Sequence, residues 1–419
     1  MTKSQIRARP SPASPHPLSR RFAALLASAA LAVGLAACGT LPREAGPIRL
    51  ASGTLQRTQD PRIRASDAPK LKALVEDIQH RLSADGPAQS ILALSGGGAS
   101  GAYGAGVLYG WSQSGHRPKF EIVTGVSTGA LAAPYAFLGP AWDEKLRTAY
   151  VDGGAGGLLS FDSFRPLVSP SLFSSRVLKT LIWKSVTPEM LRQIAAEHAK
   201  GRRLLVATTN LDSEETVIWD MGLLASQGDD NALTLFREVL LASASIPGVF
   251  PPVLIKGLSG DGTLIEEMHV DGGVNTPFLG VPDSLLLWTA PRSATTSDFY
   301  ILINGQTDRR QSFTKGTLKE ILARSYDSAS KASTRSYLAA NVAFADRNHI
   351  RLMLSAIPSE TKTSSLDFDR KSMAALFEAG RARAASGQAW ARVHAQPIVP
   401  EIAAPPALDV SLTPASTAR

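Results

Sequence analysis

The feature that most constrains this chain is a pair of short apolar strands, each of which ends in a glycine-rich turn that leads into a helix. Residues 91–94 precede the turn Ser95–Gly101, and residues 120–124 precede the turn Gly125–Gly129. Further strand and helix patterns alternate up to a last helix that begins at Asp369. Parallel strands need crossover connections, usually helices, and they read as continuous apolar runs when both faces are covered. The sequence therefore predicts an α/β fold with a mostly parallel central sheet flanked by helices.

The compact part of the chain is predicted to span residues 86–396. Before it, residues 38–85 combine a stretch rich in Pro, Arg and Ser with a helix over 69–82, in which apolar residues recur every three or four positions. We expect this region to be a tether and a leading helix. Residues 397–419 contain five prolines and no apolar period, which predicts a disordered tail.

The N-terminus has the pattern of an export signal over residues 1–37. Five basic residues and no acid precede the uncharged run Phe22–Leu35, which is too short to span a bilayer. The single cysteine, Cys38, closes Leu35–Cys38, which resembles the lipobox of bacterial lipoproteins. The resemblance implies cleavage before Cys38, acylation of that residue and a place in the bacterial cell envelope, where Gly39 favours the outer membrane. A plain secretory signal with an incidental cysteine is the alternative.

Composition excludes several other classes of protein. No apolar run reaches the roughly 18 to 20 residues needed to span a bilayer, which argues against a polytopic membrane protein. One cysteine excludes an intrachain disulfide framework and a cysteine-rich zinc site. The formal charge of +8 falls to +3 once residues 1–37 are removed, and no dense basic stripe remains. We therefore expect no nucleic-acid partner.

The turn Gly125–Gly129 has the pattern G-x-S-x-G between a strand and a helix, which is typical of a nucleophile elbow. The flanking glycines allow a sharp turn and leave room around Ser127, while the N-terminus of the next helix favours negative charge at that point. Ser127 is therefore a candidate nucleophile. A small-residue turn that only packs a helix on a strand is the alternative.

The turn Ser95–Gly101 contains three consecutive glycines, which can point backbone N–H groups at an anion. Gly96, Gly98 and Gly101 also fit the spacing of a dinucleotide fingerprint. However, the next strand has no acidic residue for a ribose, and no Lys-Ser/Thr pair follows for a phosphate. An oxyanion hole one strand–helix unit before a nucleophile elbow explains both turns, and we expect no cofactor.

A serine hydroxyl needs a base, because it is a poor nucleophile at its own pKa. Asp271 ends a strand-like run and precedes Gly272–Gly273, which permits a tight turn; a plain turn is the alternative. His349 and His394 lie late enough in the chain to serve an α/β-hydrolase, but neither has a loop signature. His269 would share a strand face with Asp271 and is a candidate for a direct or an orienting role.

Three of these features occur in the order found in the patatin-like phospholipase family. They are the turn Ser95–Gly101, the turn Gly125–Gly129 and the run Asp271–Gly273. Residues 241–252 also resemble the segment that precedes the aspartate in that family. The resemblance covers residues 91–283.

The resemblance implies the three-layer patatin-like fold and a Ser–Asp dyad without histidine. Ser127 would be the nucleophile and Asp271 the general base, while the backbone N–H groups of Gly97 and Gly98 would form the oxyanion hole. The other motif glycines are Gly96, Gly101, Gly125, Gly129, Gly272 and Gly273. Ser100 stands where the family is often basic, a departure that weakens the phospholipid assignment more than the esterase assignment.

Together these features predict a serine-dependent lipid acyl hydrolase that forms an acyl-enzyme and is anchored to the envelope through acylated Cys38. We expect its substrate to be a carboxylic ester of a lipid and expect no metal or other cofactor. The head group, acyl length and oligomeric state are left open. One alternative is a non-catalytic envelope lipoprotein that binds lipid or a partner protein. The other is a histidine-assisted α/β-hydrolase that uses His349 or His394.

Overall fold

The computed structural model describes most of the compact part of the chain. The expected export signal, Cys38 and the expected tail over residues 397–419 lie outside the described residues. The described residues are 43–46, 60–64, 66–82, 88–152, 175–259, 262–282, 285–289, 297–308, 313–314 and 316–395.

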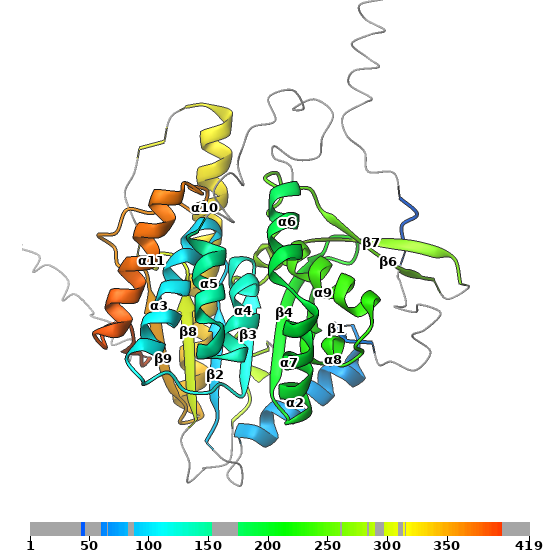
Figure 1. Ribbon diagram of the computed structural model, residues 1–419, viewed down its shortest axis with the longest axis horizontal. Helices are drawn as coiled ribbons and strands as arrows, with labels where there is room; N and C mark the ends of the chain where they lie inside the picture. Colours follow the sequence, from blue (N-terminus) through cyan, green and yellow to red (C-terminus); the bar gives the residue numbers. More distant parts are fainter. Residues whose placement is uncertain are drawn as a thin grey trace, which may run out of the picture.

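Within the described residues, ten strands form one mixed sheet (Figure 1). The strands are β1 (Arg62–Arg64), β2 (Ser90–Leu94), β3 (Ile122–Val126), β4 (Arg203–Asn210), β5 (Glu215–Asp220), β6 (Val253–Leu258), β7 (Leu264–Asp271), β8 (Asp298–Ile303), β9 (Arg351–Ala356) and β10 (Ala391–Arg392). Their order is β1-β5-β4-β3-β2-β8-β9-β10, and the β6–β7 hairpin joins the sheet through β4. The central strands β4, β3, β2, β8 and β9 run parallel, and the strands at both edges run antiparallel. The prediction of a mostly parallel sheet is confirmed.

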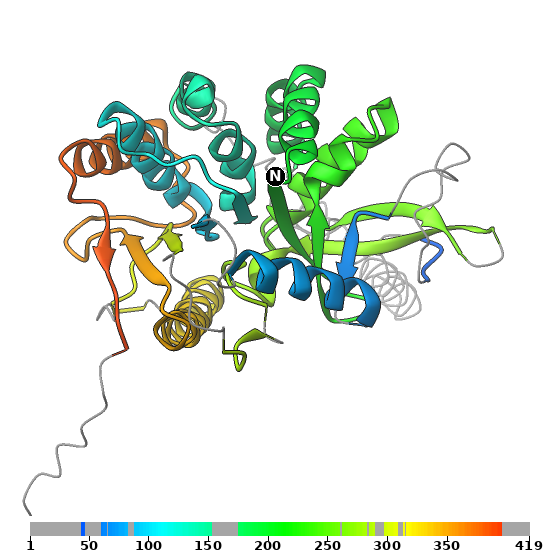
Figure 2. The same ribbon diagram turned by 90° about the horizontal axis from the view of Figure 1, so that it is seen from below.

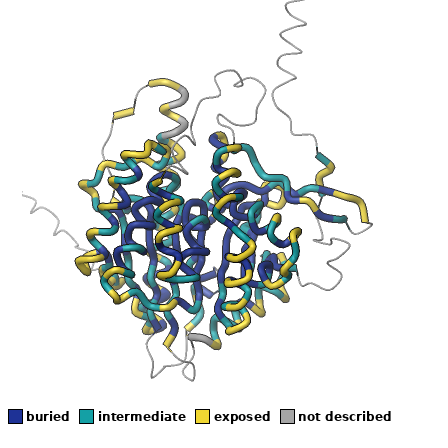
Figure 3. Tube along the Cα trace, viewed as in Figure 1, coloured by how far each residue is buried: buried dark blue, intermediate teal, exposed yellow. Residues whose placement is uncertain are grey.

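Helices cover both faces of the sheet, as the sequence predicts (Figure 2). The described helices are α2 (Ala68–Leu82), α3 (Gly101–Gln113), α4 (Thr128–Leu138), α5 (Asp143–Tyr150), α6 (Arg176–Ser185), α7 (Pro188–Ala199), α8 (Met221–Ala225), α9 (Asp230–Ser243), α10 (Leu318–Arg347) and α11 (Arg370–Ala385), with short 3-10 turns at Gly98–Ser100, Pro140–Trp142 and Gly272–Val274. Helices α3, α4, α7 and α11 lie on one face, and α2 and α10 lie on the other. Buried residues follow the central strands between these two layers (Figure 3). None of the described helices combines the length and apolar character that crossing a membrane requires.

Local capping explains where several helices begin. Thr187 accepts a hydrogen bond from the backbone N–H of Met190 at 3.2 Å, and Pro188 occupies the first helical position of α7. Asp229 and Asp369 cap α9 and α11 in the same way. Such side chains satisfy N–H groups that have no partner within the helix.

Along one side, strand β4 pairs with two different strands, one after the other. Strand β3 pairs with its first part, up to Val126 opposite Ala207. Strand β7 pairs with its last part, beginning with Asp271 opposite Thr208. Strand β5 occupies the other side of β4 over residues 205–210. The carboxyl ends of β3 and β7 therefore meet at adjacent residues of β4.

Parts of the region before α2, which the sequence predicts to be a tether, pair with the sheet. Strand β1 adds to the edge strand β5, and Ala45 bridges to Glu266 of β7. The buried Arg62 side chain forms an ion pair with buried Glu267 at 3.2 Å. Edge strands offer unpaired backbone groups, which explains why these segments attach where they do.

Helices α3 and α11 pack closely because small residues face each other where they cross. A Cβ atom on Gly106 of α3 would lie 2.0 Å from the carbonyl oxygen of Phe377 in α11. A Cβ atom on Gly380 of α11 would lie 2.2 Å from the carbonyl oxygen of Tyr103 in α3. The backbones therefore approach to a distance that only glycine permits at these positions.

This packing predicts that Gly106→Ala destabilises the protein. The added methyl group must push α11 away, and overpacking of this kind costs typically about 1–3 kcal/mol. Denaturant unfolding of the variant would show a lower midpoint than that of the parent. Gly316→Ala is the matched control, because nothing lies within 4 Å of its Cβ position. Equal midpoints for the two variants would contradict the packing argument.

Candidate active site

Ser127 lies on a strained turn between β3 and α4. Its φ is 57° and its ψ is −126°, a combination that L-residues rarely adopt outside functional sites. The backbone N–H of Ser127 donates to Ser243 Oγ at 3.0 Å, and Ser243 Oγ–H donates to the carbonyl of Ala207 at 2.7 Å. Ser243 therefore ties the turn to β4. This geometry is that of the elbow that the G-x-S-x-G pattern predicts.

The glycine after the elbow lets α4 approach β2. A Cβ atom on Gly129 would lie 2.4 Å from the carbonyl oxygen of Leu94, so a side chain there would push the helix off the sheet. On the opposite side, the Cβ position of Gly96 is 3.2 Å from Cβ of Ser127. The two predicted glycine turns are therefore in direct contact.

Asp271 accepts a hydrogen bond from Ser127 Oγ at 2.6 Å. Both side chains are buried, with exposed fractions of 2% and 4%. The other carboxylate oxygen, Oδ1, accepts from the backbone N–H of Gly273 at 2.7 Å, and the N–H of Asp271 donates to the carbonyl of Ser245 at 3.0 Å. The carboxylate is thus held in one orientation toward the serine.

Burial raises the pKa of Asp271 from its usual value near 4 to about 7. The hydrogen bonds from Ser127 and Gly273 act in the opposite direction and lower it. A carboxyl group with a pKa near neutrality can both accept and return a proton under physiological conditions. The environment therefore suits Asp271 for acid–base chemistry on the serine hydroxyl.

The loop before α3 presents backbone N–H groups beside Ser127. Gly97 and Gly98 have φ values of 151° and 55°, which favour glycine. The N–H of Gly96 donates to the carbonyl of Pro277, and the N–H of Ala99 donates to the carbonyl of Ser365. Among the described residues, no atom accepts a hydrogen bond from the N–H of Gly97 or Gly98. These two groups are therefore free to bind an anionic oxygen.

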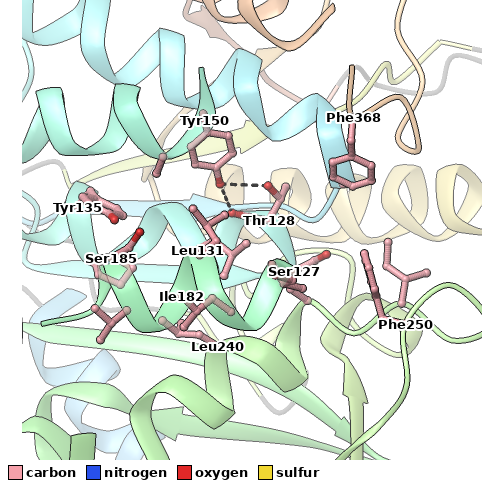
Figure 4. Close-up of a pocket in the computed structure, with 18 of the residues that line it drawn as sticks. Ser127, Thr128, Leu131, Tyr135, Tyr150, Ile182, Ser185, Leu240, Phe250 and Phe368 are labelled. Carbon is pink, nitrogen blue, oxygen red and sulfur yellow. Dashed lines mark hydrogen bonds between the residues drawn. The ribbon is translucent and has the colours of Figure 1, made fainter. Parts of the chain in front are cut away.

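An apolar pocket extends from Ser127 between α4, α5, α6 and α9. Figure 4 shows Ser127 beside Phe250 and Phe368 at one end, with Tyr135 and Ser185 at the other. The pocket holds about 760 Å³ of empty space, part of it open to solvent. Its lining residues are Gly98, Ser127, Thr128, Leu131, Pro134, Tyr135, Ala149, Tyr150, Leu178, Leu181, Ile182, Ser185, Val186, Leu240, Ala244, Ile246, Phe250, Phe368 and Met373. A long apolar group attached to a reacting carbonyl at Ser127 would fit this lining.

Tyr150 supports the first turn of α4 from inside the pocket. Its hydroxyl donates to the carbonyl of Thr128 at 2.7 Å and lies 3.1 Å from Thr128 Oγ1 (Figure 4). The hydroxyl is therefore satisfied locally, and the ring presents an apolar surface to the cavity.

Within the described part of the chain, none of the three histidines considered from the sequence hydrogen-bonds to Ser127 or Asp271. The ring nitrogens of His269 lie 3.0 Å from Thr208 Oγ1 and 3.3 Å from Glu267 Oε2. His349 is exposed and precedes β9, so it lies at the amino edge of the parallel strands, opposite the site. His394 pairs with Asp346 at 3.3 Å. The contacts of His269 fit an orienting role for β7.

Ser100, the departure from the family pattern, is buried and hydrogen-bonded. Its hydroxyl lies 2.7 Å from Thr363 Oγ1. The position that is often basic in the family therefore joins the loop before α3 to the segment before α11. Within the described residues, no group of three or more His, Cys, Asp or Glu side chains could hold a metal ion.

Sequence reasoning missed two residues that shape the site. Ser243 positions the elbow, and Asn304 holds the glycine loop, because its side chain donates to the carbonyl of Ser95 at 2.8 Å. Ser243 lies within the family-like segment 241–252, so the segment was found but the role of its serine was not. Asn304 follows β8 and carried no sequence signal.

The chain was compared with protein-family models, curated proteins and solved structures. Residues 92–281 match a family model described as patatin-like phospholipase. No curated protein matches the chain. Among solved structures, the chain is similar to VipD from Legionella pneumophila, with 13% identity over 73% of this chain and 68% of that chain and a TM-score of 0.32. It is also similar to the type III effector protein ExoU, with 14% identity over 74% of this chain and 55% of that chain and a TM-score of 0.26.

The raised pKa of Asp271 predicts a specific dependence of stability on pH. The folded state holds this proton more tightly than the unfolded state, so its contribution to stability is lost as the pH rises from about 4 to about 7. Asp271→Asn removes the titration. The free energy of unfolding of this variant, relative to the parent, should therefore rise by up to about 1.4 kcal/mol per pH unit across that window.

Chemical denaturation at a series of pH values measures this difference. Ser127→Ala is the control, because it leaves the buried carboxyl group in place. Its stability should still fall as the pH rises, over a window that extends to higher pH because the hydrogen bond from Ser127 lowers the pKa of Asp271. Parallel curves for Asp271→Asn and the parent would show that Asp271 does not titrate in this range.

Proposed function

Because residues 92–281 of this chain match a family model described as patatin-like phospholipase, we propose that the protein is a serine-dependent lipid acyl hydrolase that acts through an acyl-enzyme on Ser127. The observation that carries the proposal is the 2.6 Å hydrogen bond from Ser127 Oγ to a buried carboxylate with a pKa of about 7. The apolar pocket that begins at the same serine supports a lipid acyl group as the part of the substrate that is bound.

In the acylation step, Ser127 Oγ attacks the ester carbonyl while its proton passes to Oδ2 of Asp271. The negative charge that develops on the carbonyl oxygen is stabilised by the free N–H groups of Gly97 and Gly98 and by the N-terminus of α4. Protonated Asp271 then returns the proton to the leaving alkoxide. The products of this step are an alcohol and an acyl ester of Ser127.

In the deacylation step, a water molecule replaces the alcohol, and Asp271 accepts a proton from it as it attacks the acyl ester. The tetrahedral intermediate uses the same two N–H groups, and it collapses to a fatty acid as protonated Asp271 returns the proton to the leaving Oγ of Ser127. A pKa of about 7 suits both directions of transfer, because the group is present in both protonation states near neutral pH.

The proposal also places the mature chain in the bacterial cell envelope, attached through acylated Cys38, with the outer membrane as the expected site. The support is the sequence alone: the basic leader, the apolar run and the position of the single cysteine. Several acyl chains on one residue bind a bilayer stably, because each buried methylene contributes about 0.8 kcal/mol.

A fluorophosphonate probe tests the nucleophile directly. We expect one covalent adduct by intact mass on the parent chain and none on Ser127→Ala. Asp271→Asn should label slowly and lose roughly 100-fold to 10,000-fold in turnover, the usual range for a general base. Ser386→Ala is the matched control, because this serine is exposed at the end of α11 and does not line the pocket.

Two outcomes would contradict the proposal. No adduct on folded parent protein would favour the non-catalytic lipoprotein. Loss of turnover in His349→Ala or His394→Ala, with full turnover in Asp271→Asn, would favour the histidine-assisted hydrolase.

The base role of Asp271 predicts how activity depends on pH. Asp271 must be deprotonated to accept the serine proton, so kcat/KM for a soluble ester should rise with pH and level off above a pKa of about 7. Steady-state kinetics across the pH range in which the protein is folded would measure this. A profile that is flat from acid to neutral pH would exclude Asp271 as the titrating base.

A further inference from the structure

A very short segment connects the proposed lipid anchor at Cys38 to the folded domain. Only residues 39–42 separate Cys38 from Arg43. Five fully extended steps between these Cα atoms span at most about 18 Å. The point at which the folded domain meets Arg43 must therefore lie close to any bilayer that holds Cys38.

Arg43 and its neighbours are fixed to the domain by several contacts. Arg43 forms an ion pair with Asp212, in which one nitrogen–oxygen distance is 2.6 Å. The backbone N–H of Glu266 donates to the carbonyl of Glu44 at 2.8 Å, and Gly46 packs against the side chain of Ile265. This segment is therefore docked on β7 and on the turn after β4.

The docking point lies at the carboxyl edge of the parallel strands, which is the edge that carries the site. Asp212 follows the end of β4 at Asn210, and Ser127 follows the end of the parallel neighbour β3. Figure 1 shows the short segment at residues 43–46 beside β7 on the same upper side of the molecule as the free end of α10. A bilayer within reach of Cys38 therefore lies on the side of the active site.

Helix α10 projects beyond this edge. It has 30 residues and a length of about 45 Å, whereas the following strand, β9, has six residues and a length of about 20 Å. The helix ends at Arg347, just before β9 begins at Arg351, so its C-terminus lies at the amino edge. Its N-terminal half therefore extends past the carboxyl edge, as Figure 1 shows.

Large apolar side chains are exposed on and beside this projection. Phe313, which precedes α10, is 97% exposed, and Ile321 in its first turns is 47% exposed. Tyr326, on the same helix, is 45% exposed. Leu366 is exposed beside Ser365, whose carbonyl contacts the glycine loop.

We propose that the bilayer that holds acylated Cys38 is also the surface on which the carboxyl edge rests, with Phe313, Ile321 and Leu366 inserted into its interface. The protein then hydrolyses lipids of its own membrane, which enter the pocket at Ser127 from that bilayer. The inference rests on the proposed function, because it assumes both the acyl anchor and the lipid substrate.

The short connection between Cys38 and Arg43 favours the bilayer over other partners for this apolar surface. A second copy or another protein could cover Phe313 and Ile321 in solution. The anchor, however, holds the bilayer permanently beside the edge that carries these side chains. Apolar side chains gain free energy by leaving water for that interface.

Vesicle mixing tests the orientation. The acylated mature chain is reconstituted in vesicles of phosphatidylethanolamine and phosphatidylglycerol that contain a fluorogenic phospholipid ester, and protein-free vesicles carry a second ester of different colour. We expect hydrolysis in the protein-bearing vesicles to exceed hydrolysis in the protein-free vesicles by at least about tenfold, since the edge is held on its own bilayer. Equal rates in both populations would overturn the proposal.

Substitutions test the contact surface. Phe313→Ser combined with Ile321→Ser should lower hydrolysis of the bilayer ester about tenfold relative to hydrolysis of a water-soluble ester by the same variant. Leu287→Ser is the matched control, because Leu287 is 89% exposed and lies beside Leu286, which contacts the C-terminal end of α10. An unchanged ratio in the double variant, or a change from dimer to monomer as its only effect, would overturn the proposal.

The same samples separate failure of this inference from failure of the proposed function. Absence of soluble-ester hydrolysis by the parent chain would reject the hydrolase, and an intact mass without acyl groups on Cys38 would reject the anchor. When the parent chain hydrolyses the soluble ester and carries acyl groups on Cys38, two ratios test the orientation. The first compares hydrolysis in protein-bearing and protein-free vesicles, and the second compares hydrolysis of the bilayer ester and the soluble ester.

Discussion

The hydrogen-bond register of β4 is the constraint on which the site depends. Its residues Ala207 and Thr208 pair with the last residue of β3 and the last residue of β7, respectively. Ser127 follows the first of these strands and Asp271 ends the second, so two groups 144 residues apart meet at 2.6 Å. A shift of one residue in either pairing would turn the side chains to the opposite face.

Strand β7 also shows how one fold can give two carboxyl groups different chemistry. Glu267 and Asp271 are both buried, but Glu267 is paired with the guanidinium of Arg62 at 3.2 Å. Hydrogen bonds from the Ser127 hydroxyl and the Gly273 N–H lower the pKa of Asp271, but burial outweighs them and raises it. Among the described residues, the cation Arg62 pairs with Glu267 and no cation pairs with Asp271, which suits Asp271 for proton transfer.

The sheet connects the proposed anchor, the apolar pocket and the projecting half of α10. The docked segment at residues 43–46 reaches β7, β7 carries Asp271, and the pocket begins at the serine bonded to it. A short connection to a bilayer would therefore set the direction from which a lipid approaches. In this arrangement the surface that binds the membrane and the surface that opens to the pocket are the same edge.

The sequence by itself determined the α/β class, the two glycine turns and the choice of Ser127 and Asp271, because each depends on local patterns within a few residues. Strands β1 and β10 were not predicted, since strands of three and two residues carry little periodicity. Strand β6 was not predicted either. The role of Ser243 could not be predicted either, because its partners Ser127 and Ala207 are distant in the chain. Only the tertiary structure decided which strands adjoin β4, how deeply Asp271 is buried and on which edge Arg43 docks. These properties arise from contacts between residues far apart in sequence, and no local pattern encodes them.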